Sequence, residues 1–478
     1  MNKSDLSPDQ HEAYSGILTW LNRGTETKQT LTLAGFAGCG KTTVVSVLAN
    51  ELPQPLAFCA FTGKASSVLG RTLRSQGIET TPKLPNFDGH GQRVYESRPY
   101  CGTIHGLIYR PCDWCMPKEV AHGHDGQGNC RRTEHELSQG EVPSTHCLEH
   151  GHPRGRCPDC DRCPGCEPPP MRPRTKGSCG NCKTFRFTRR DKLDRDYKLI
   201  VADEASMISD DMLAALLQYD IPILAVGDHG QLNPVRGSGS LMLKPDIRLE
   251  KIHRQAENNP IIALSKFVRE TGTIHPRFCD GKHIWMDQVR NLDAFIGKSF
   301  APGRTDLLSS VFICGTNKKR VEVNHTVRRA LGVEGPPQKG DVVICIKNKP
   351  PIYNGMRGVI TSNVDYEDDE KRPKYLAQVD YPEDGVIDDA EMSGHQFYLP
   401  KPSPIDWDWA SDHGITPLAS LGDLYDYGYA LTCHKMQGSQ AEKVAVRLDD
   451  IGWMAPDEQT RWKYTSVTRA QKMLVLFS

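Results

Sequence analysis

Two stretches of the chain combine residues that can bind and hydrolyse a nucleoside triphosphate. The first, GFAGCGKTT at residues 35–43, follows an apolar run, precedes a helical pattern and fits the spacing G-x-x-x-x-G-K-[ST]. Glycines there let backbone N–H groups wrap phosphates, and the following helix adds its N-terminal dipole. Lys41 is expected to reach the β- and γ-phosphates and the Thr42 hydroxyl to bind Mg²⁺. The residues expected to hold ATP here are Gly35, Gly38, Gly40, Lys41, Thr42 and Thr43.

The second stretch, YKLIVADEAS at residues 197–206, is an apolar strand that ends in Asp203 and Glu204. A carboxylate at the end of a strand beside a phosphate loop can hold Mg²⁺, which we expect of Asp203. Glu204 is then placed to act as the general base that activates water. The alternative is a pair of acidic residues that caps the helix expected to follow.

A third apolar strand, PILAVGDHGQLNPV at residues 222–235, runs into a polar turn. Gln231 could sense the γ-phosphate and orient the attacking water, whereas Asp228 could be a turn residue alone. Three apolar strands that each end in polar groups predict an α/β fold with a parallel sheet, and the site lies at the carboxyl ends of its strands.

The order of motifs along the chain resembles that of superfamily 1 DNA helicases, most closely the RecD-like and Dda-like branch. The motifs are SPDQHEAY, GFAGCGKT, FTGKAS, GTIHGL, DEAS, GDHGQLNPV, HRQ, TCHKMQGSQ and YTSVTRA. The resemblance covers roughly residues 1–110 and 190–478 and omits 111–187. It implies two RecA-like motor domains, ATP and Mg²⁺ as cofactors, and movement 5′ to 3′ on single-stranded DNA.

The resemblance also assigns roles to residues outside the phosphate loop. Gln10 resembles the glutamine that reads adenine, and Gly438 lies in the motif that links nucleotide to DNA. Arg254 and Arg469 resemble two arginines that reach the γ-phosphate from the second motor domain, where they couple hydrolysis to domain closure; the alternative for each is a solvated surface charge. The residues expected to face the DNA backbone are Thr62, Lys64, Thr103, His105, Thr432 and His434, although a lone threonine or histidine is often structural.

The resulting architecture has four parts. We expect a RecA-like domain at 1–106 and 188–250, a cysteine-rich insertion at 107–187, a second RecA-like domain at 251–337 and 425–478, and an SH3-like β-barrel at 338–424. The barrel is expected because apolar residues alternate at 339–364 around Asn354-Gly355, a strong hairpin signal.

The chain has 17 cysteines, and ten of them lie between Cys112 and Cys182. Two C-x-x-C turns at the edges of the insertion supply the four soft ligands of a tetrahedral zinc site. Six further cysteines and several histidines lie between them, so we expect two or three Zn²⁺ ions, which would replace a missing apolar core. The expected ligands are Cys112, Cys115, Cys147, His150, Cys157, Cys160, Cys163, Cys166, Cys179 and Cys182. The alternative is an iron–sulfur cluster on CPDCDRCPGC at 157–166, although one gap is a residue short of that pattern.

The insertion interrupts the chain where the resembling helicases hold a small domain with a hairpin that splits the duplex. Residues 172–195 contain nine Lys or Arg and two Asp, with Phe185 and Phe187 among them. Basic residues neutralise phosphates and aromatic rings stack on bases, so this segment is a candidate contact with DNA near the fork. The alternative is a solvated basic loop with its phenylalanines packed inside.

The formal net charge is zero, so any basic surface must be local. Neither a membrane span nor a signal peptide is recognisable, which predicts an intracellular, cytoplasmic protein. The sequence is compatible with a bacterial, phage or viral origin and does not decide among sources. Single strands and DNA forks are the expected partners of a monomeric motor, together with replication or recombination proteins. Two alternatives remain open: an RNA or RNA–DNA translocase of the same superfamily, and a zinc-based nucleic-acid-binding scaffold with a vestigial motor.

Overall fold

The computed structural model describes most of the motor region and a small part of the cysteine-rich insertion. The described residues are 3–25, 27–36, 38–81, 98–111, 118–122, 141–147, 187–234, 238–251, 259–300, 303, 306–346, 348, 351–367, 374–393 and 423–478. The chain forms two compact units, one of residues 1–104 and 194–478 and the other of residues 105–193. Each unit is described by itself.

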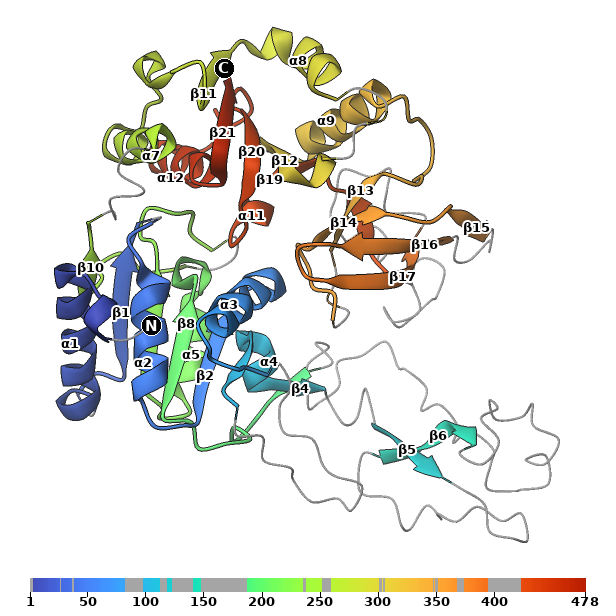
Figure 1. The fold of residues 1–478 in the computed structure, drawn as a ribbon. Helices are drawn as coiled ribbons and strands as arrows, with labels where there is room; N and C mark the ends of the chain where they lie inside the picture. The colour runs from blue at the N-terminus through green and yellow to red at the C-terminus, as the bar shows by residue number, and fades with distance from the viewer. Residues whose placement is uncertain are drawn as a thin grey trace, which may run out of the picture. The chain divides into compact units, whose positions relative to one another are not determined.

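Domain 1, residues 3–104 and 194–251, is built on a parallel sheet (Figure 1). Within the described residues its strands run in the order β10-β1-β9-β8-β2-β3, and every neighbouring pair is parallel. The strands are β1 (Thr30–Gly35), β2 (Leu56–Ala60), β3 (Tyr100–Thr103), β8 (Leu199–Asp203), β9 (Ile223–Gly227) and β10 (Ile247–Leu249). Near-continuous apolar runs are typical of strands covered on both faces, and β2 and β9 are buried throughout.

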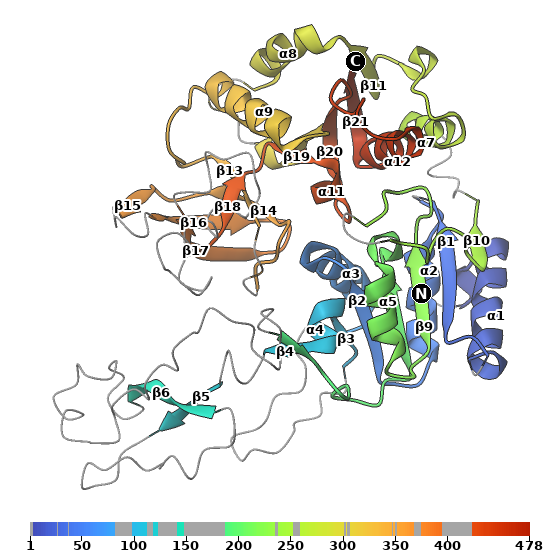
Figure 2. The ribbon, with the colours of Figure 1, turned by 180° about the vertical axis from the view of Figure 1, so that it is seen from behind.

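Helices flank this sheet, as Figures 1 and 2 show from opposite sides. They are α1 (Pro8–Arg23), α2 (Lys41–Glu51), α3 (Gly63–Ser75) and α5 (Asp210–Leu217). Apolar side chains of α1 and α2, among them Tyr14, Ile17 and Val44, join those of the strands in one buried cluster. Because β1, β9 and β8 are adjacent and parallel, their carboxyl ends meet at one edge of the sheet, as the sequence predicts.

Domain 2, residues 259–338 and 428–478, contains a second parallel sheet. Its described strands are ordered β11-β21-β20-β12-β19, all parallel. They are β11 (Ile284–Asp287), β12 (Ser310–Cys314), β19 (Ala430–Thr432), β20 (Ala441–Arg447) and β21 (Ala470–Phe477). The helices of this domain are α7 (Pro260–Thr271), α8 (Leu292–Ser299), α9 (Asn317–Ala330), α11 (Cys433–Met436) and α12 (Pro456–Val467).

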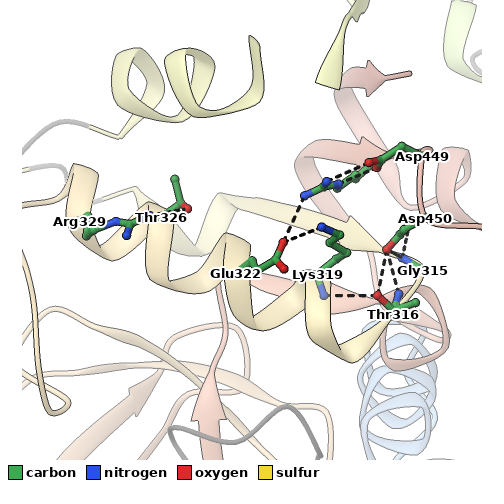
Figure 3. A network of polar contacts seen from close by, with 9 residues as sticks. Gly315, Thr316, Lys319, Glu322, Thr326, Arg329, Asp449 and Asp450 are labelled. Carbon is green, nitrogen blue, oxygen red and sulfur yellow. Dashed lines mark hydrogen bonds and ion pairs between the residues drawn. The ribbon is translucent and has the colours of Figure 1, made fainter. Parts of the chain in front are cut away.

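The turn from β12 into α9 is held by a carboxylate from a distant loop (Figure 3). Asp450 accepts hydrogen bonds from the backbone N–H groups of Gly315 and Thr316 and from the Thr316 hydroxyl, at 2.9–3.3 Å. The same hydroxyl accepts from the backbone of Lys319 at 3.3 Å and so caps α9. Asp450 therefore joins the loop after β20 to the start of α9.

The half-barrel, residues 339–427, interrupts domain 2. Its described strands form an antiparallel sheet in the order β15-β16-β14-β13-β18, with β17 paired to β16. They are β13 (Val342–Cys345), β14 (Arg357–Ile360), β15 (Asp365–Glu367), β16 (Lys374–Tyr381), β17 (Val386–Ser393) and β18 (Tyr425–Tyr427). The predicted Asn354-Gly355 turn lies between β13 and β14, and Gly355 has a φ of 95°. β18 pairs with β13, so the sheet takes in three residues beyond the expected boundary at 424.

The second unit, residues 105–193, includes most of α4 (Ile104–Ile108) and two strand pairs. β4 (Tyr109–Pro111) is antiparallel to β7 (Phe187–Arg189), and β5 (Lys118–His122) is parallel to β6 (Glu141–Cys147). Nine of the ten predicted zinc ligands lie outside the described residues; Cys147 ends β6, and its side chain is not described. In the described part of the chain, no group of three or more His, Cys, Asp or Glu could hold a metal ion.

Seven cysteines lie outside the insertion. Six of them are buried, as small hydrophobic residues commonly are, and Cys279 is half-buried. Within the described ranges, no helix has the length and apolar character that crossing a membrane requires.

Candidate functional site: a phosphate site shared by two parallel-sheet domains

The phosphate loop joins β1 to α2 at the edge of the domain 1 sheet. Gly38 and Gly40 have φ angles of 84° and 78°, a left-handed conformation that glycine adopts without steric cost, and Gly40 is the N-cap of α2. Lys41 is the first residue of α2, and its Nζ donates to the carbonyl oxygens of Gly35 at 2.6 Å and Phe36 at 3.1 Å. The loop therefore has the backbone cradle and the ammonium group that a triphosphate requires.

Gln10, the predicted adenine reader, lies beside this loop and is 2% exposed. Its side-chain oxygen accepts from the backbone of Ser7 at 3.0 Å, in a capping box that starts α1. Its Nε2 donates to the carbonyl of Cys39 at 3.2 Å. The structure thus shows Gln10 fastening α1 to the phosphate loop, and a role in reading adenine stays a prediction.

Asp203 ends β8, and Glu204 follows it at the same edge of the sheet. Oδ1 of Asp203 accepts the backbone N–H of Glu204 at 2.9 Å, and Glu204 has a φ of 51°. Burial raises the pKa of both carboxyl groups. The Asp203 charge raises the pKa of Glu204 further, whereas the charges of Arg469 and Lys41 lower it. A carboxylate with a raised pKa suits the activation of water, which is the role predicted for Glu204.

The turn after β9, residues 228–232, contacts domain 2. Asp228, which the sequence left as a turn residue, is 1% exposed and accepts from the Gly230 backbone at 2.9 Å and from the Tyr464 hydroxyl at 2.6 Å. Gln231 is 5% exposed, and within the described residues its Oε1 is buried without a hydrogen-bond donor. A buried amide oxygen of this kind requires an explanation, and a ligand at the site would supply one.

One face of α12 forms hydrogen bonds to this turn. Arg461 donates to the carbonyls of His229 at 2.7 Å and Gln231 at 3.0 Å, and the Thr465 hydroxyl accepts from the backbone of Leu232 at 3.1 Å. Residues 461, 464 and 465 are spaced i, i+3 and i+4, so they share a helix face. Gln437 adds a bond from its Nε2 to the carbonyl of Leu232 at 3.2 Å.

Arg469 follows the same helix and is 4% exposed. Its guanidinium donates to the Thr465 carbonyl at 3.0 Å, the Ser439 carbonyl at 3.2 Å and the Thr468 hydroxyl at 3.0 Å. Its charge acts on Glu204 and lowers the pKa of that carboxyl. Because it is buried, Arg469 is not the solvated surface charge of the alternative, and its role at the γ-phosphate stays a prediction. Arg254, the other predicted arginine, lies outside the described residues.

An arginine that sequence reasoning missed also meets the phosphate loop. The guanidinium of Arg269, on α7, lies 3.3 Å from the centroid of the Phe36 ring, and the ring of His229 lies 4.7 Å from the same centroid. A guanidinium over an aromatic face is attracted by the ring quadrupole. Neither Arg269 nor Arg461 belongs to a recognisable motif, so only their positions on helices of domain 2 could have drawn attention to them.

The residues predicted to face DNA lie at several element ends. Thr62 caps α3 by accepting from the backbone of Ala65 at 3.1 Å, and Thr103 ends β3. Thr432 is the N-cap of α11, and burial lowers the pKa of His434 within that helix. His105 lies in α4, in the other compact unit.

Two of these element ends are brought together. A Cβ built on Gly438, whose φ is 72°, would lie 2.8 Å from the Cβ of Ala65, so the glycine permits close approach of the segment after α11 to the start of α3. Lys64 is 6% exposed and forms ion pairs with Glu383 at 3.1 Å and Asp384 at 3.2 Å. Its ammonium is thus bound by carboxylates of the half-barrel.

Two family models match the chain. The model described as an AAA domain matches residues 22–237, and the model described as a UvrD-like helicase C-terminal domain matches residues 427–477. The first range contains the phosphate loop, the Asp203–Glu204 pair and the 228–232 turn; the second contains α12 and Arg469. Among curated proteins, none matches the chain.

Solved structures of Pif1 helicases are also similar to the chain. One of these structures concerns the unwinding of forked double-stranded DNA by two coordinating Pif1 helicases. It is 15% identical to this chain, the match covers 99% of this chain and 92% of the Pif1 chain, and the TM-score is 0.48. Pif1 from Candida albicans is 15% identical, with 99% and 94% covered and a TM-score of 0.47. Pif1 from Bacteroides with ADP-AlF3 and single-stranded DNA is 14% identical, with 98% and 92% covered and a TM-score of 0.46. The sequence identity to these structures is low, so the functional assignment depends on the two family models and on the geometry of the phosphate site.

Proposed function

We propose that this chain, an ATP-dependent helicase of superfamily 1, moves 5′ to 3′ along single-stranded DNA and unwinds the duplex ahead of it. The observation that carries the proposal is the contact of α12 with the 228–232 turn. One helix of domain 2 holds that turn of domain 1 and is followed directly by Arg469, so a change at the phosphates reaches both domains. The direction of movement is inferred from the motifs shared with the RecD-like and Dda-like branch.

The phosphate site suggests how hydrolysis proceeds. The loop amides and Lys41 bind the β- and γ-phosphates, and Glu204 takes a proton from the attacking water that Gln231 orients. Arg469 and Arg254 neutralise charge in the transition state. The Thr42 hydroxyl and the Asp203 carboxylate fit Mg²⁺, because both are hard oxygen ligands at the loop edge. When bound, Mg²⁺ supplies charge neutralisation on the β- and γ-phosphate oxygens.

The DNA strand is proposed to follow the element ends around α3 and α11. Thr62, Lys64 and Thr103 from domain 1, and Thr432 and His434 from domain 2, offer hydroxyl, amide and cationic donors for the backbone. A DNA contact of His105, in the second unit, is proposed from the family resemblance alone. Domain closure around ATP would then shift one set of donors relative to the other and advance the strand. The half-barrel corresponds, in this proposal, to the SH3-like domain of the resembling helicases.

The insertion at 107–187 is proposed to be a zinc module that stands where relatives keep the strand-splitting element. Its support is the sequence: ten cysteines within 71 residues, 112–182, and few apolar residues to form a core. The partners proposed on these grounds are single strands, DNA forks, and proteins of replication or recombination.

Strand displacement on tailed duplexes tests the proposal. With ATP and Mg²⁺, a duplex that carries a 5′ single-stranded tail should be separated and a 3′-tailed duplex should not, and Lys41→Ala should separate neither. Separation of the 3′-tailed duplex alone would overturn the polarity. ATP hydrolysis stimulated by RNA and not by DNA would favour the RNA translocase, and no hydrolysis with any single strand would favour the scaffold.

A further inference from the structure

One face of α3 gathers three donors that bind the acidic turn between β16 and β17. Lys64, Ser67 and Arg71 are spaced i, i+3 and i+7, so they line a single face of this helix. The turn between the two strands carries Glu383 and Asp384. Domain 1 and the half-barrel therefore meet through a cationic helix face and an anionic turn.

The contacts centre on Asp384. Its carboxylate binds the Lys64 ammonium at 3.2 Å, the Ser67 hydroxyl at 3.1 Å and the Arg71 guanidinium at 3.4 Å. Glu383 binds Lys64 at 3.1 Å through its side chain and accepts from Arg71 through its backbone carbonyl. The side chain of Asp384 is 5% exposed and that of Glu383 is 56% exposed, so Asp384 is the buried anchor.

Stabilisation of the fold does not by itself explain why Lys64 and Asp384 form a buried ion pair. Removing an ammonium and a carboxylate from water costs free energy that their attraction offsets only in part, and apolar residues of similar size would often serve as well. The half-barrel also contacts α3 through close packing that does not depend on charge. A Cβ on Gly63 would lie 2.6 Å from the Cβ of Tyr353, so this tyrosine of the half-barrel lies directly against the start of α3.

The donor set matches another ligand. An ammonium, a hydroxyl and a guanidinium are the groups with which proteins bind nucleic-acid phosphates, and Lys64 is among the residues expected to face DNA. We propose that Lys64, Ser67 and Arg71 form a phosphate site for the tracked strand, and that Glu383 and Asp384 occupy it when no strand is bound. The inference rests on the proposed function and deepens it, because single-stranded DNA must displace the acidic turn to bind.

The test compares the carboxylate-free variant E383Q/D384N with the wild-type chain. Binding of a fluorescent oligothymidylate is followed by anisotropy, without nucleotide, at several salt concentrations. E383Q/D384N should bind about 3- to 10-fold more tightly at low salt, because no carboxylate competes with phosphate. The double variant K64Q/R71Q should bind more weakly than wild type and show a shallower salt dependence, since two phosphate contacts are removed.

The matched control is D365N/E367Q, which removes two exposed carboxylates from β15 of the same sheet. Its affinity should differ from that of wild type by less than about 2-fold, and a gain equal to that of E383Q/D384N would overturn the site in favour of bulk charge. Unchanged or weaker binding by E383Q/D384N, with an unchanged melting temperature, would overturn the proposal. The acidic turn would then serve only to hold the half-barrel against α3. A different result would refute the proposed function itself: neither the wild type nor any variant would bind single strands or hydrolyse ATP in their presence.

Discussion

Glu204 adopts a backbone conformation that residues other than glycine seldom hold. Its φ of 51° follows directly after β8, and the neighbouring Asp203 stabilises the bend by accepting its N–H. A non-glycine residue in this region costs of order 1 kcal/mol or more and persists when its surroundings impose it. One explanation for the strain is the role proposed for Glu204 as a general base beside the phosphates.

Replacement of this carboxylate tests that explanation. Glu204→Gln keeps the shape and removes the base, so we expect kcat for DNA-stimulated ATP hydrolysis to fall about 10²- to 10⁴-fold. The KM for ATP should change little, because the side chain acts on water and not on the nucleotide. Asp220→Asn is a suitable control, since Asp220 is exposed and has a φ of 52° outside the site. A steady-state assay in which both variants lose activity equally would refute the assignment.

Asp450 shows how one side chain fixes a junction of domain 2 (Figure 3). Asp450→Ala leaves the N–H groups of Gly315 and Thr316 without this acceptor, which should destabilise domain 2 by about 1–3 kcal/mol. The melting temperature should fall by several degrees. Asp449→Ala removes the partly exposed pair with Arg447, at 2.6 Å and 2.9 Å, and should cost less than about 1 kcal/mol. Equal thermal shifts in the two variants would contradict this account.

At the scale of elements, α12 contributes two contacts to the site. Its 461–465 face holds the 228–232 turn, and its C-terminal end leads into Arg469, whose charge acts on Glu204. A helix is stiff over this length, so the residues proposed to sense the γ-phosphate in domain 1 and to neutralise it from domain 2 should move together. The half-barrel contributes none of the hydrogen bonds that hold the 228–232 turn among the described residues; it meets α3.

Arg461 is the residue by which this coupling can be measured. Arg461→Ala leaves the carbonyls of His229 and Gln231 without their shared donor, so Gln231 should be less well oriented. We expect DNA-stimulated kcat to fall about 10-fold with ATP affinity nearly unchanged, because a small displacement of an orienting group can cost that much or more. Lys463→Ala is the matched control on the same helix, since Lys463 donates to Gly272 at 3.0 Å and not to the turn. Equal losses in both would show that Arg461 serves only the stability of α12.

The sequence was sufficient to predict the elements that carry the phosphate chemistry. Apolar runs that end in Gly35, Asp203 and Asp228 predicted strands of one parallel sheet, and the sheet order confirms this. What the sequence could not supply was contact between distant segments. Asp228 was left as a possible turn residue because Tyr464 lies 236 positions away. Lys64 was assigned to DNA from the family resemblance, and nothing local indicates its contact with Asp384.

At the scale of the whole molecule, the motor and the insertion are separate in their chemistry. Every residue assigned to ATP lies in residues 1–104 or 194–478, and the cysteine-rich segment lies in the other compact unit. Because β4 and β7 pair where the insertion leaves and rejoins the rest of the chain, its two ends are adjacent. A module attached by an antiparallel strand pair can be shortened without cutting through either parallel sheet.

Removal of residues 116–178 separates the two roles that the insertion could have. If the zinc module meets the fork, the deletion should lower the rate of duplex unwinding by about 10-fold or more and leave DNA-stimulated ATP hydrolysis within about 2-fold of wild type, because translocation needs only the two parallel-sheet domains. Metal analysis of the intact chain should give two or three zinc ions per molecule, and the deletion variant should lose those held by the inner cysteines. A brown protein that absorbs visible light would identify an iron–sulfur cluster in place of zinc. Parallel loss of ATP hydrolysis and unwinding, together with a lower melting temperature, would instead show that the motor depends on the module for its fold.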